Sequence, residues 1–304
     1  MDGILPLWKE RGMTSHDCVF KLRKILKTKK VGHGGTLDPD VDGVLPICIG
    51  KGTKVIEYLQ DSGKIYVGEI TLGYTTTTED VSGDIVEKTP VLEMLETTLI
   101  DETMNQMVGT ITQIPPMYSA VKVNGKRLYE YAREGLEVER PERKAVIDYF
   151  KRTSEPVYNV EKQTLSWRFE VGCGKGTYVR TLAVDTGAKL GYAAHMSDLT
   201  RVSSGGFSAG QCLTLTQVSE KMAGEEFDFL QPIEQAMSLF QRLDLTDLEY
   251  QSVKDGGFLK VNDYCTLNPS ELIAVYHNQL LVSIYGQHPT KLEFFKPIKV
   301  LRNN

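Results

Sequence analysis

A short stretch rich in glycine and aspartate places an acid between a loop and an apolar run. Residues 32–45 read GHGGTLDPDVDGVL, with Asp38 near the middle. The glycines permit tight backbone turns, whereas residues 44–49 are apolar and expected to be buried. A carboxylate held rigidly at the edge of a core is a candidate nucleophile or base. Asp38 is therefore the first candidate catalytic residue.

The same aspartates allow two other interpretations. Asp38, Asp40 and Asp42 alternate as in an EF-hand calcium loop, which requires a bidentate glutamate at its twelfth position. This chain has Ile49 there, inside the apolar run, which argues against calcium. The other interpretation is a solvated acidic turn, in which Asp38 only caps or bends the chain. On spacing alone, that turn is the more common role of a loop aspartate.

Longer segments carry a family resemblance. GHGGTLDP at residues 32–39 resembles the G-H-x-G-x-L-D-P signature of the TruB-type tRNA pseudouridine synthases, in which the aspartate is catalytic. Glu10 stands where that family usually has proline, and residues 199–202 follow its pattern only in part. The similarity continues, in the order of the family, through GILPLWKERGMTS (3–15), KIYVGEITLG (64–73), QIPPMYSAVKVNGKRLYEYAREG (113–135) and GKGTYVRTLAVDTG (174–187).

The resemblance implies a fold, a substrate and a set of site residues. The fold class would be α+β: a catalytic domain at 1–235 with a mixed, largely antiparallel sheet, and a small β-rich RNA-binding module at 240–304, PUA-like or divergent. The reaction would convert the T-loop uridine at tRNA position 55 to pseudouridine. The implied catalytic residues are Asp38, Tyr66 and Arg180, and the implied substrate-binding residues are His33, Lys64, Lys122 and Arg201.

The chemistry of this isomerisation explains why those residue types are suitable. The base is detached from ribose, rotated and rejoined through C5, so no electron or external group enters. We therefore expect no cofactor and no metal, in keeping with the lack of a nicotinamide fingerprint, P-loop or metal cluster. An ionised Asp38 could attack the sugar, attack the uracil ring or start an elimination from the ribose, and the sequence leaves all three routes open.

A stacked uridine is out of reach of a side chain, so the target base must be flipped into the site. By resemblance, Tyr66 packs against the flipped base and takes part in a proton step, with an ordinary core tyrosine as the alternative. Arg180 would pair with Asp38 and favour its ionised form. His33 would lie near the flipped nucleotide, although a loop histidine is about as often structural.

Composition and charge limit the classes of protein to which this chain could belong. The 304 residues carry a net charge of −5, which by itself argues weakly against an RNA substrate. Basic residues nevertheless concentrate at 21–30, where a groove for RNA and a solvated face are the two interpretations. Five scattered cysteines without a C-x-x-C pair argue against disulfides and zinc. Without a signal segment or membrane span, we expect a cytoplasmic protein. We expect it to be a monomer, and the resemblance implies the T-arm of tRNA as its partner.

Hydrophobic periodicity predicts strands and helices in alternation. The expected strands are 44–49, 64–72, 109–113, 117–123, 145–150 and 164–171, with a tight turn at Asn124-Gly125. Helices are expected from a Ser15 cap to about Leu26, at 53–59, from Thr89-Pro90 onward and at 177–189, closed by Gly191. Residues 74–90 are interpreted as a loop, residues 222–238 as the domain boundary, and residues 271–277 and 279–285 as a hairpin.

Two other functional classes remain to be tested. Residues 206–210, GFSAG, fit the G-x-S-x-G pattern of serine hydrolases, but the preceding residues are too polar for the buried strand which that motif requires. A noncatalytic RNA-binding or RNA-chaperone protein would share the basic surface. It would bind tRNA without isomerising it, so a turnover assay separates it from a synthase.

Overall fold

The computed structural model describes residues 1–302 and contains two main sheets. The larger sheet has the strand order β1-β3-β13-β4-β12-β10-β7, with β2, β11 and β14 attached. Within it β3 and β13 run parallel and the other pairs run antiparallel, as predicted. Its strands are β1 Gly3–Lys9, β2 Val31–His33, β3 Asp42–Ile49, β4 Lys64–Leu72, β7 Gly109–Gln113, β10 Arg143–Arg152, β11 Val157–Asn159, β12 Thr164–Cys173, β13 Ala194–Ser204 and β14 Phe207–Ser208.

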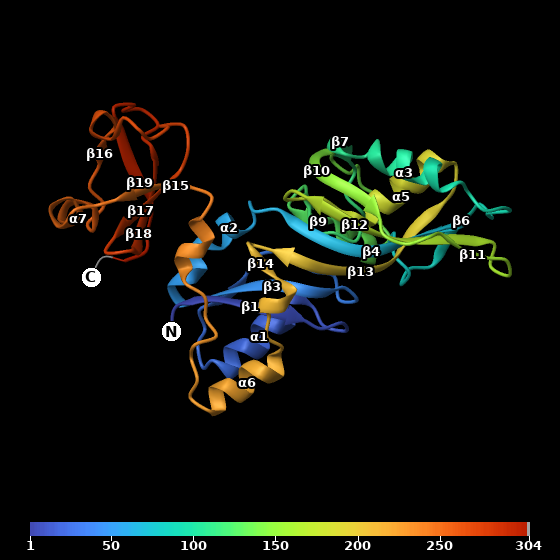
Figure 1. The fold of residues 1–304 in the computed structure, drawn as a ribbon, viewed down its shortest axis with the longest axis horizontal. Helices are drawn as coiled ribbons and strands as arrows, with labels where there is room; N and C mark the ends of the chain where they lie inside the picture. Colours follow the sequence, from blue (N-terminus) through green and yellow to red (C-terminus); the bar gives the residue numbers. More distant parts are fainter. Residues whose placement is uncertain (303–304) are drawn as a thin grey trace.

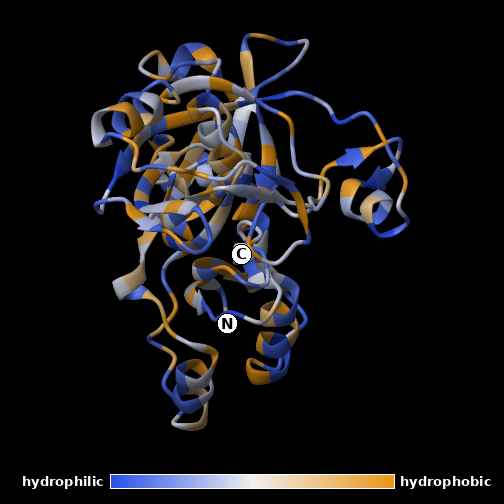
Figure 2. Cartoon of the chain, turned by 90° about the vertical axis from the view of Figure 1, so that its right-hand side faces the viewer, coloured by the Kyte–Doolittle hydropathy of each residue, from blue (hydrophilic) through white to orange (hydrophobic). Residues whose placement is uncertain are grey.

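Strand β4 lies in the middle of this sheet and follows the predicted alternation. Tyr66, Ile70 and Leu72 face the core, whereas Val67, Glu69 and Thr71, which alternate with the buried positions, are half-buried. Apolar and polar residues also alternate along strands elsewhere in the sheet (Figure 2). Antiparallel pairing places Tyr66 opposite Arg201 of β13 and opposite Val171 of β12. Two candidate site residues thus become cross-strand neighbours.

The first helix, α1 Ser15–Ile25, begins beside the acid loop, the segment 34–41 between β2 and β3. Thr14, not Ser15 as predicted, caps the helix. The Thr14 hydroxyl accepts a hydrogen bond from the Asp17 N–H, and the Asp17 carboxylate accepts one from the Thr14 N–H. The Ser15 hydroxyl instead exchanges hydrogen bonds with the backbone of Leu37, at 2.9 Å from its N–H and 3.2 Å from its C=O. Ser15 therefore ties the helix to the acid loop.

Helix α5 Val179–Leu190 carries Arg180 in its first turn. It ends at Gly191, whose left-handed φ of 85° closes the helix as predicted. Arg180 is buried, with 6% of its surface exposed. Its position at the start of the helix directs the side chain back toward the acid loop.

Three local predictions need correction. Residues 74–90 are not a plain loop, because β5 Tyr74–Thr76 and β6 Ile85–Lys88 form a small sheet. No helix starts at Thr89-Pro90: the Thr89 and Val91 N–H groups bond Gly73 and Gln163, and α3 Thr97–Asn105 follows later. The expected strand at 117–123 shrinks to β8 Lys122–Val123, paired with β9 Lys126–Arg127, and α4 Leu128–Arg133 follows. Between β8 and β9, Asn124 and Gly125 both have positive φ, as the predicted tight turn requires.

The expected helix at 53–59 is split into the 3-10 helix η1 Gly50–Val55 and α2 Ile56–Leu59. Helix α6 Leu215–Ala223 then packs beside α1 (Figure 1). No helix in the described part of the chain is long and apolar enough to cross a membrane.

The smaller sheet follows η3 Ile233–Met237 and contains the predicted hairpin, with Asn278 and Gln279 at positive φ between its strands. It stands at one end of the molecule, at the upper left of Figure 1. Its order is β15-β17-β18-β19-β16. The bounds are β15 Gln241–Asp244, α7 Asp247–Val253, β16 Leu259–Lys260, η4 Val261–Tyr264, β17 Ile273–His277, β18 Leu280–Gln287 and β19 Phe294–Val300.

The two sheets share one hydrophobic cluster. Ile4 and Val44 of the large sheet and Ala274 and Leu281 of the small sheet belong to it, bridged by residues of η3. Polar contacts reinforce the junction, since Lys299 donates to Glu57 and Arg302 donates to Glu234. Deleting everything after about residue 240 would therefore expose apolar core, so truncation does not separate binding from chemistry cleanly.

We expect Leu281→Ala to destabilise the large sheet as well as the small one. The side chain is fully buried in the shared cluster, so the cost should be about 2–5 kcal/mol. Both tryptophans, Trp8 in β1 and Trp167 in β12, report only on the large sheet. Urea unfolding followed by tryptophan fluorescence should show a lower midpoint, whereas Leu248→Ala, at an 84% exposed position, should leave it unchanged. An unmoved tryptophan transition in Leu281→Ala would mean that the two sheets unfold independently.

Candidate active site

The acid loop owes its close packing to a glycine at its end. Gly43 has a φ of 123°, in the left-handed region that favours glycine. A Cβ there would stand 2.2 Å from the backbone oxygen of Arg201, because β13 runs directly alongside. No larger residue fits without displacing the strand, so the position of the loop relative to β13 is fixed.

Lys9 holds the loop from the other side, a role that the sequence analysis missed. Its Nζ donates to the carbonyl oxygens of Glu10 and Pro39, both at 3.1 Å, and of Val41 at 2.7 Å. The side chain is completely buried. Burial lowers the pKa of Lys9, although nearby acids, Asp42 and Asp38 among them, oppose that shift. A buried ammonium that bonds the Pro39 and Val41 carbonyls fixes the backbone that directly follows Asp38.

Arg180 and Asp38 form an ion pair. Arg180 Nε lies 3.0 Å from Asp38 Oδ2, and the arginine side chain is 7% exposed while that of the aspartate is 41% exposed. The other two guanidinium nitrogens donate to the carbonyls of Thr78 and Tyr118, each at 2.9 Å. Two other chain segments therefore orient the guanidinium, which in turn fixes one oxygen of Asp38 and leaves part of the carboxylate open to a substrate.

Burial raises the pKa of Asp38 above its ordinary 3.8. The guanidinium of Arg180 lowers it in part, as the sequence analysis expected, whereas the negative charge of Asp80 raises it further. The pairing is present, but its effect on the pKa is smaller than that of burial. Asp38 is therefore a more basic carboxylate than an aspartate in water, which suits a nucleophile or a base.

This direction gives a pH prediction. We expect the single-turnover rate with bound RNA to fall on acidification along a limb whose midpoint lies above pH 3.8, because the protonated acid is inactive. Arg180→Met should move that limb to higher pH, since it removes the charge that favours the carboxylate. Rates measured from pH 4.5 to 8 test both points. A limb that stays in place in Arg180→Met would show that another group titrates.

Tyr66 lies beside this pair in the core. It is 7% exposed, and burial raises its pKa, with a smaller contribution in the same direction from Asp38. The phenol therefore stays protonated at neutral pH, so it can donate a hydrogen bond or a proton but is not a base. Its neighbour Arg201 partly offsets the shift.

Arg201 is 1% exposed, and its guanidinium bonds the backbone of the acid loop and of β3. Its Nε donates to Val44 O at 2.8 Å, and its other nitrogens donate to Thr36 O and Gly35 O at 3.4 and 3.3 Å. These bonds position the backbone that carries Asp38. A direct contact between Arg201 and RNA stays a prediction, and the geometry favours a positioning role.

The other three predicted binding residues differ in their surroundings. His33 is half-buried, and the Gly35 N–H donates to its Nδ1 at 3.4 Å; burial lowers its pKa, which keeps the ring neutral. Lys64 is buried, donates to Gln60 O at 3.0 Å and has a pKa lowered to about 8, chiefly by burial. Lys122 is exposed on the β8–β9 hairpin. Their roles toward a substrate stay predictions.

The segment between β5 and β6 has a role that could not be assigned from the sequence. Besides the Thr78 carbonyl that holds Arg180, it supplies Glu79, whose Oε2 accepts a hydrogen bond from the Thr181 hydroxyl at 2.8 Å. Glu79 has a φ of 64°, uncommon for a residue with a side chain. The segment therefore supports the first turn of α5 and the arginine within it.

Two rival kinds of site find little support. Ile49, at the twelfth position of the calcium pattern, is a buried β3 residue, and residues 1–302 contain no group of three or more His, Cys, Asp or Glu side chains placed to hold a metal. Ser208 bonds Gln211 at a 3-10 turn, and no contact with a histidine is found for it in the described chain. The nucleophile elbow of a hydrolase is not formed.

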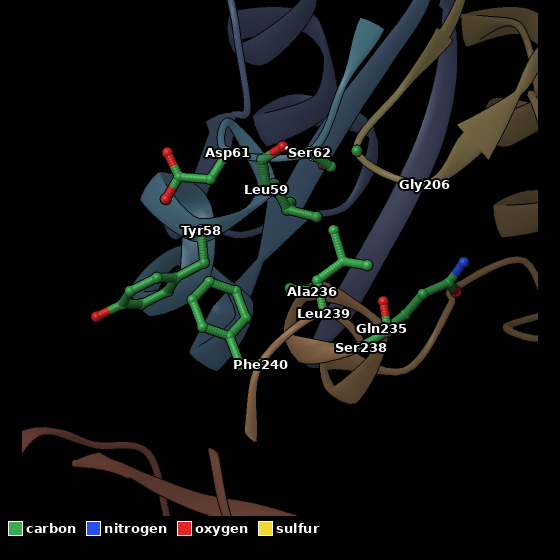
Figure 3. A pocket seen from close by; sticks show the side chains of 11 residues that line it. Tyr58, Leu59, Asp61, Ser62, Gly206, Gln235, Ala236, Ser238, Leu239 and Phe240 are labelled. Atoms are coloured by element: carbon green, nitrogen blue, oxygen red, sulfur yellow. Dashed lines mark hydrogen bonds between the residues drawn. The ribbon is translucent and has the colours of Figure 1, made fainter. Parts of the chain in front are cut away.

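A pocket lies away from these residues, between α2 and η3 (Figure 3). Tyr58 and Phe240 meet there edge to face, with ring centroids 5.6 Å apart. Neither Asp38 nor its partners line it. The pocket belongs to the junction of the two sheets and not to the candidate active site.

Comparisons with known proteins place this fold and sequence in a family. Residues 23–179 match the model of the N-terminal domain of the TruB family pseudouridylate synthases, and residues 180–238 match that of the C-terminal domain of tRNA pseudouridylate synthase B. A tRNA pseudouridine synthase B of Streptococcus sanguinis is 55% identical over 300 residues, 99% of each chain. That of Listeria innocua is 51% identical over 301 residues, 99% of this chain and 98% of that protein.

Solved structures are similar at the level of the fold and the sequence. A chain in the crystal structure of a Cbf5-Nop10-Gar1 complex superposes with a TM-score of 0.75 at 28% identity, covering 99% of this chain and 85% of that one. A chain in the structure of an H/ACA RNP bound to a substrate RNA containing 2'-deoxyuridine gives 0.72 at 26% identity, with coverage of 99% and 85%.

Proposed function

The chain belongs to the TruB family of pseudouridine synthases, and we propose that it is a cytoplasmic enzyme that converts the T-loop uridine at tRNA position 55 to pseudouridine. The observation that carries the chemistry is the Arg180–Asp38 pair at 3.0 Å, beside the buried Tyr66. The names of the relatives support tRNA as the substrate, and the T-arm is the part of it that we propose is bound.

In this proposal the flipped uridine enters beside the open part of the Asp38 carboxylate. Arg180 fixes one carboxylate oxygen, so the other is free to attack or to accept a proton. Tyr66, with its raised pKa, contacts the base as a neutral phenol. Attack on the sugar, attack on the ring and elimination all begin at the same carboxylate, so the three routes share this arrangement.

The positioning residues act through the loop. Lys9, Ser15 and Arg201 bond the backbone on either side of Asp38, so the carboxylate is held before the substrate arrives. Preorganisation of this kind lowers the cost of aligning the reacting atoms. We propose that residues 1–235 form the catalytic domain and residues 240–304 an RNA-binding module docked on it.

Mapping pseudouridine in cellular tRNA tests the proposed substrate. Cells that lack the protein should lose pseudouridine at position 55 and keep it elsewhere, and re-expression should restore it. Restoration by the Asp38→Asn protein, or loss at another position instead, would overturn the assignment.

A further inference from the structure

A groove on α1 combines positive charge with an exposed aromatic ring. Phe20 is 53% exposed, and the Nζ of Lys24 lies 4.4 Å from its ring centroid. Single exposed apolar residues are ordinary, but this one lines a shallow, open groove among cations. The groove is lined by Phe20, Arg23, Lys24, Lys27, Thr28 and Lys29.

The charge of this groove is not balanced by acids. The sequence has no Asp or Glu between Asp17 and Asp38. Within residues 1–302 none of the four groove cations forms an ion pair, although Lys126, Lys221 and Lys299 elsewhere do. The Arg23 guanidinium donates to the Val31 carbonyl, at 3.2 Å, and not to an acid. On a chain of net charge −5, an unpaired basic groove is complementary to a polyanion.

The groove also lies within reach of RNA bound at the active site. The first residue of α1, Ser15, bonds Leu37 in the acid loop, and the helix of 11 residues then rises about 1.5 Å per residue. Its far end is thus about 15 Å from Ser15, and so from the part of the acid loop that Ser15 bonds. In the proposed function the uridine and its loop occupy the near end. Beyond that loop the hairpin is a paired stem without free base faces, so we assign a base at the far end to another part of the RNA.

Building on the proposed tRNA substrate, we propose that the α1 groove binds a second, unpaired segment of the tRNA, outside the hairpin that delivers the uridine. The cations contact phosphates, and the face of Phe20 that Lys24 leaves open stacks on an unpaired base. A paired stem offers no free base face, which is why the segment must be single-stranded.

Substitutions in the groove test this site by affinity. Binding affinity is measured for two RNAs, a full tRNA transcript and the isolated T-arm hairpin, at several salt concentrations. We expect Phe20→Ala to weaken binding of the full tRNA about fivefold or more, and Phe20→Tyr to bind like the wild type. Lys24→Ala should reduce the slope of log K against log salt by about one. Lys21→Ala, an exposed lysine of the same helix outside the groove, is the matched control and should change the slope less.

The hairpin distinguishes the outcomes. Affinity for the hairpin should be the same in Phe20→Ala and the wild type. Equal loss on both RNAs, or no loss on the full tRNA, would overturn the second site. Failure of the proposed function shows separately, since the wild-type protein would then form no pseudouridine in the hairpin.

Discussion

Asp38→Asn is expected to reduce pseudouridine formation by several orders of magnitude while the protein stays folded and still binds tRNA. The amide keeps the shape of the carboxylate but can neither attack nor accept the proton. Asp40→Asn, an exposed aspartate of the same loop, is the matched control and should keep its turnover. Rates are measured in a single turnover with protein in excess, so that binding does not limit them.

Stability gives Asp38→Asn a second readout. The folded-state pKa of Asp38 is raised, so the folded protein binds more protons than the unfolded chain between pH 3.8 and that pKa. Stability from this group therefore falls as pH rises through the window, and the ionised carboxylate disfavours folding at neutral pH. The neutral amide should leave Tm unchanged or slightly higher. Turnover retained by a preparation free of other synthases would contradict the catalytic role, and a large loss of Tm would contradict the charge argument.

Arg180→Lys should strongly lower the single-turnover rate with bound tRNA, and Arg180→Met should lower it further. The guanidinium reaches Asp38, Thr78 and Tyr118 at once through three nitrogens. An ammonium is a compact charge on a flexible stem and cannot reproduce that arrangement. Lysine therefore keeps the positive charge but no longer holds the Asp38 carboxylate in a fixed orientation. Methionine loses the charge as well.

The affinity for tRNA should change much less than the rate in both variants. Melting curves are needed alongside, because two carbonyls lose their donor in Arg180→Met. Rates compared at saturating tRNA, in variants that remain folded, decide the role. Weaker binding with a normal rate at saturation would mean that Arg180 contacts RNA and does not position the carboxylate.

The parts of the fold that could be predicted are those in which local pattern and tertiary structure agree. Strand β4 alternates because one of its faces is buried, and Gly191 ends α5 because it adopts the left-handed conformation. The helix expected at Thr89-Pro90 does not form, because backbone hydrogen bonds to Gly73 and Gln163 hold that segment extended. Long-range pairing of this kind leaves no local signal.

The candidate site shows the same division. Asp38, Tyr66 and Arg180 were identified from motifs. The structure pairs Arg180 with Asp38 and places Tyr66 close enough for the charge of Asp38 to affect its pKa. Lys9 lies within one of the family motifs, yet its role could not be inferred, because its partners are backbone carbonyls that any residue could provide. The Thr78 and Tyr118 carbonyls, which accept hydrogen bonds from Arg180 and orient it, could not be predicted for the same reason.

The most direct test follows the hydrogen at C5 of the target uridine. Joining the base to ribose through C5 displaces that hydrogen, so a tRNA transcript labelled with tritium at C5 of its uridines releases label only when pseudouridine forms. The purified protein should release one equivalent per tRNA, lost when uridine 55 is replaced by cytidine, and Asp38→Asn should release none. Tight binding of the transcript by the wild-type protein without release of tritium would contradict the account and indicate a noncatalytic tRNA-binding protein.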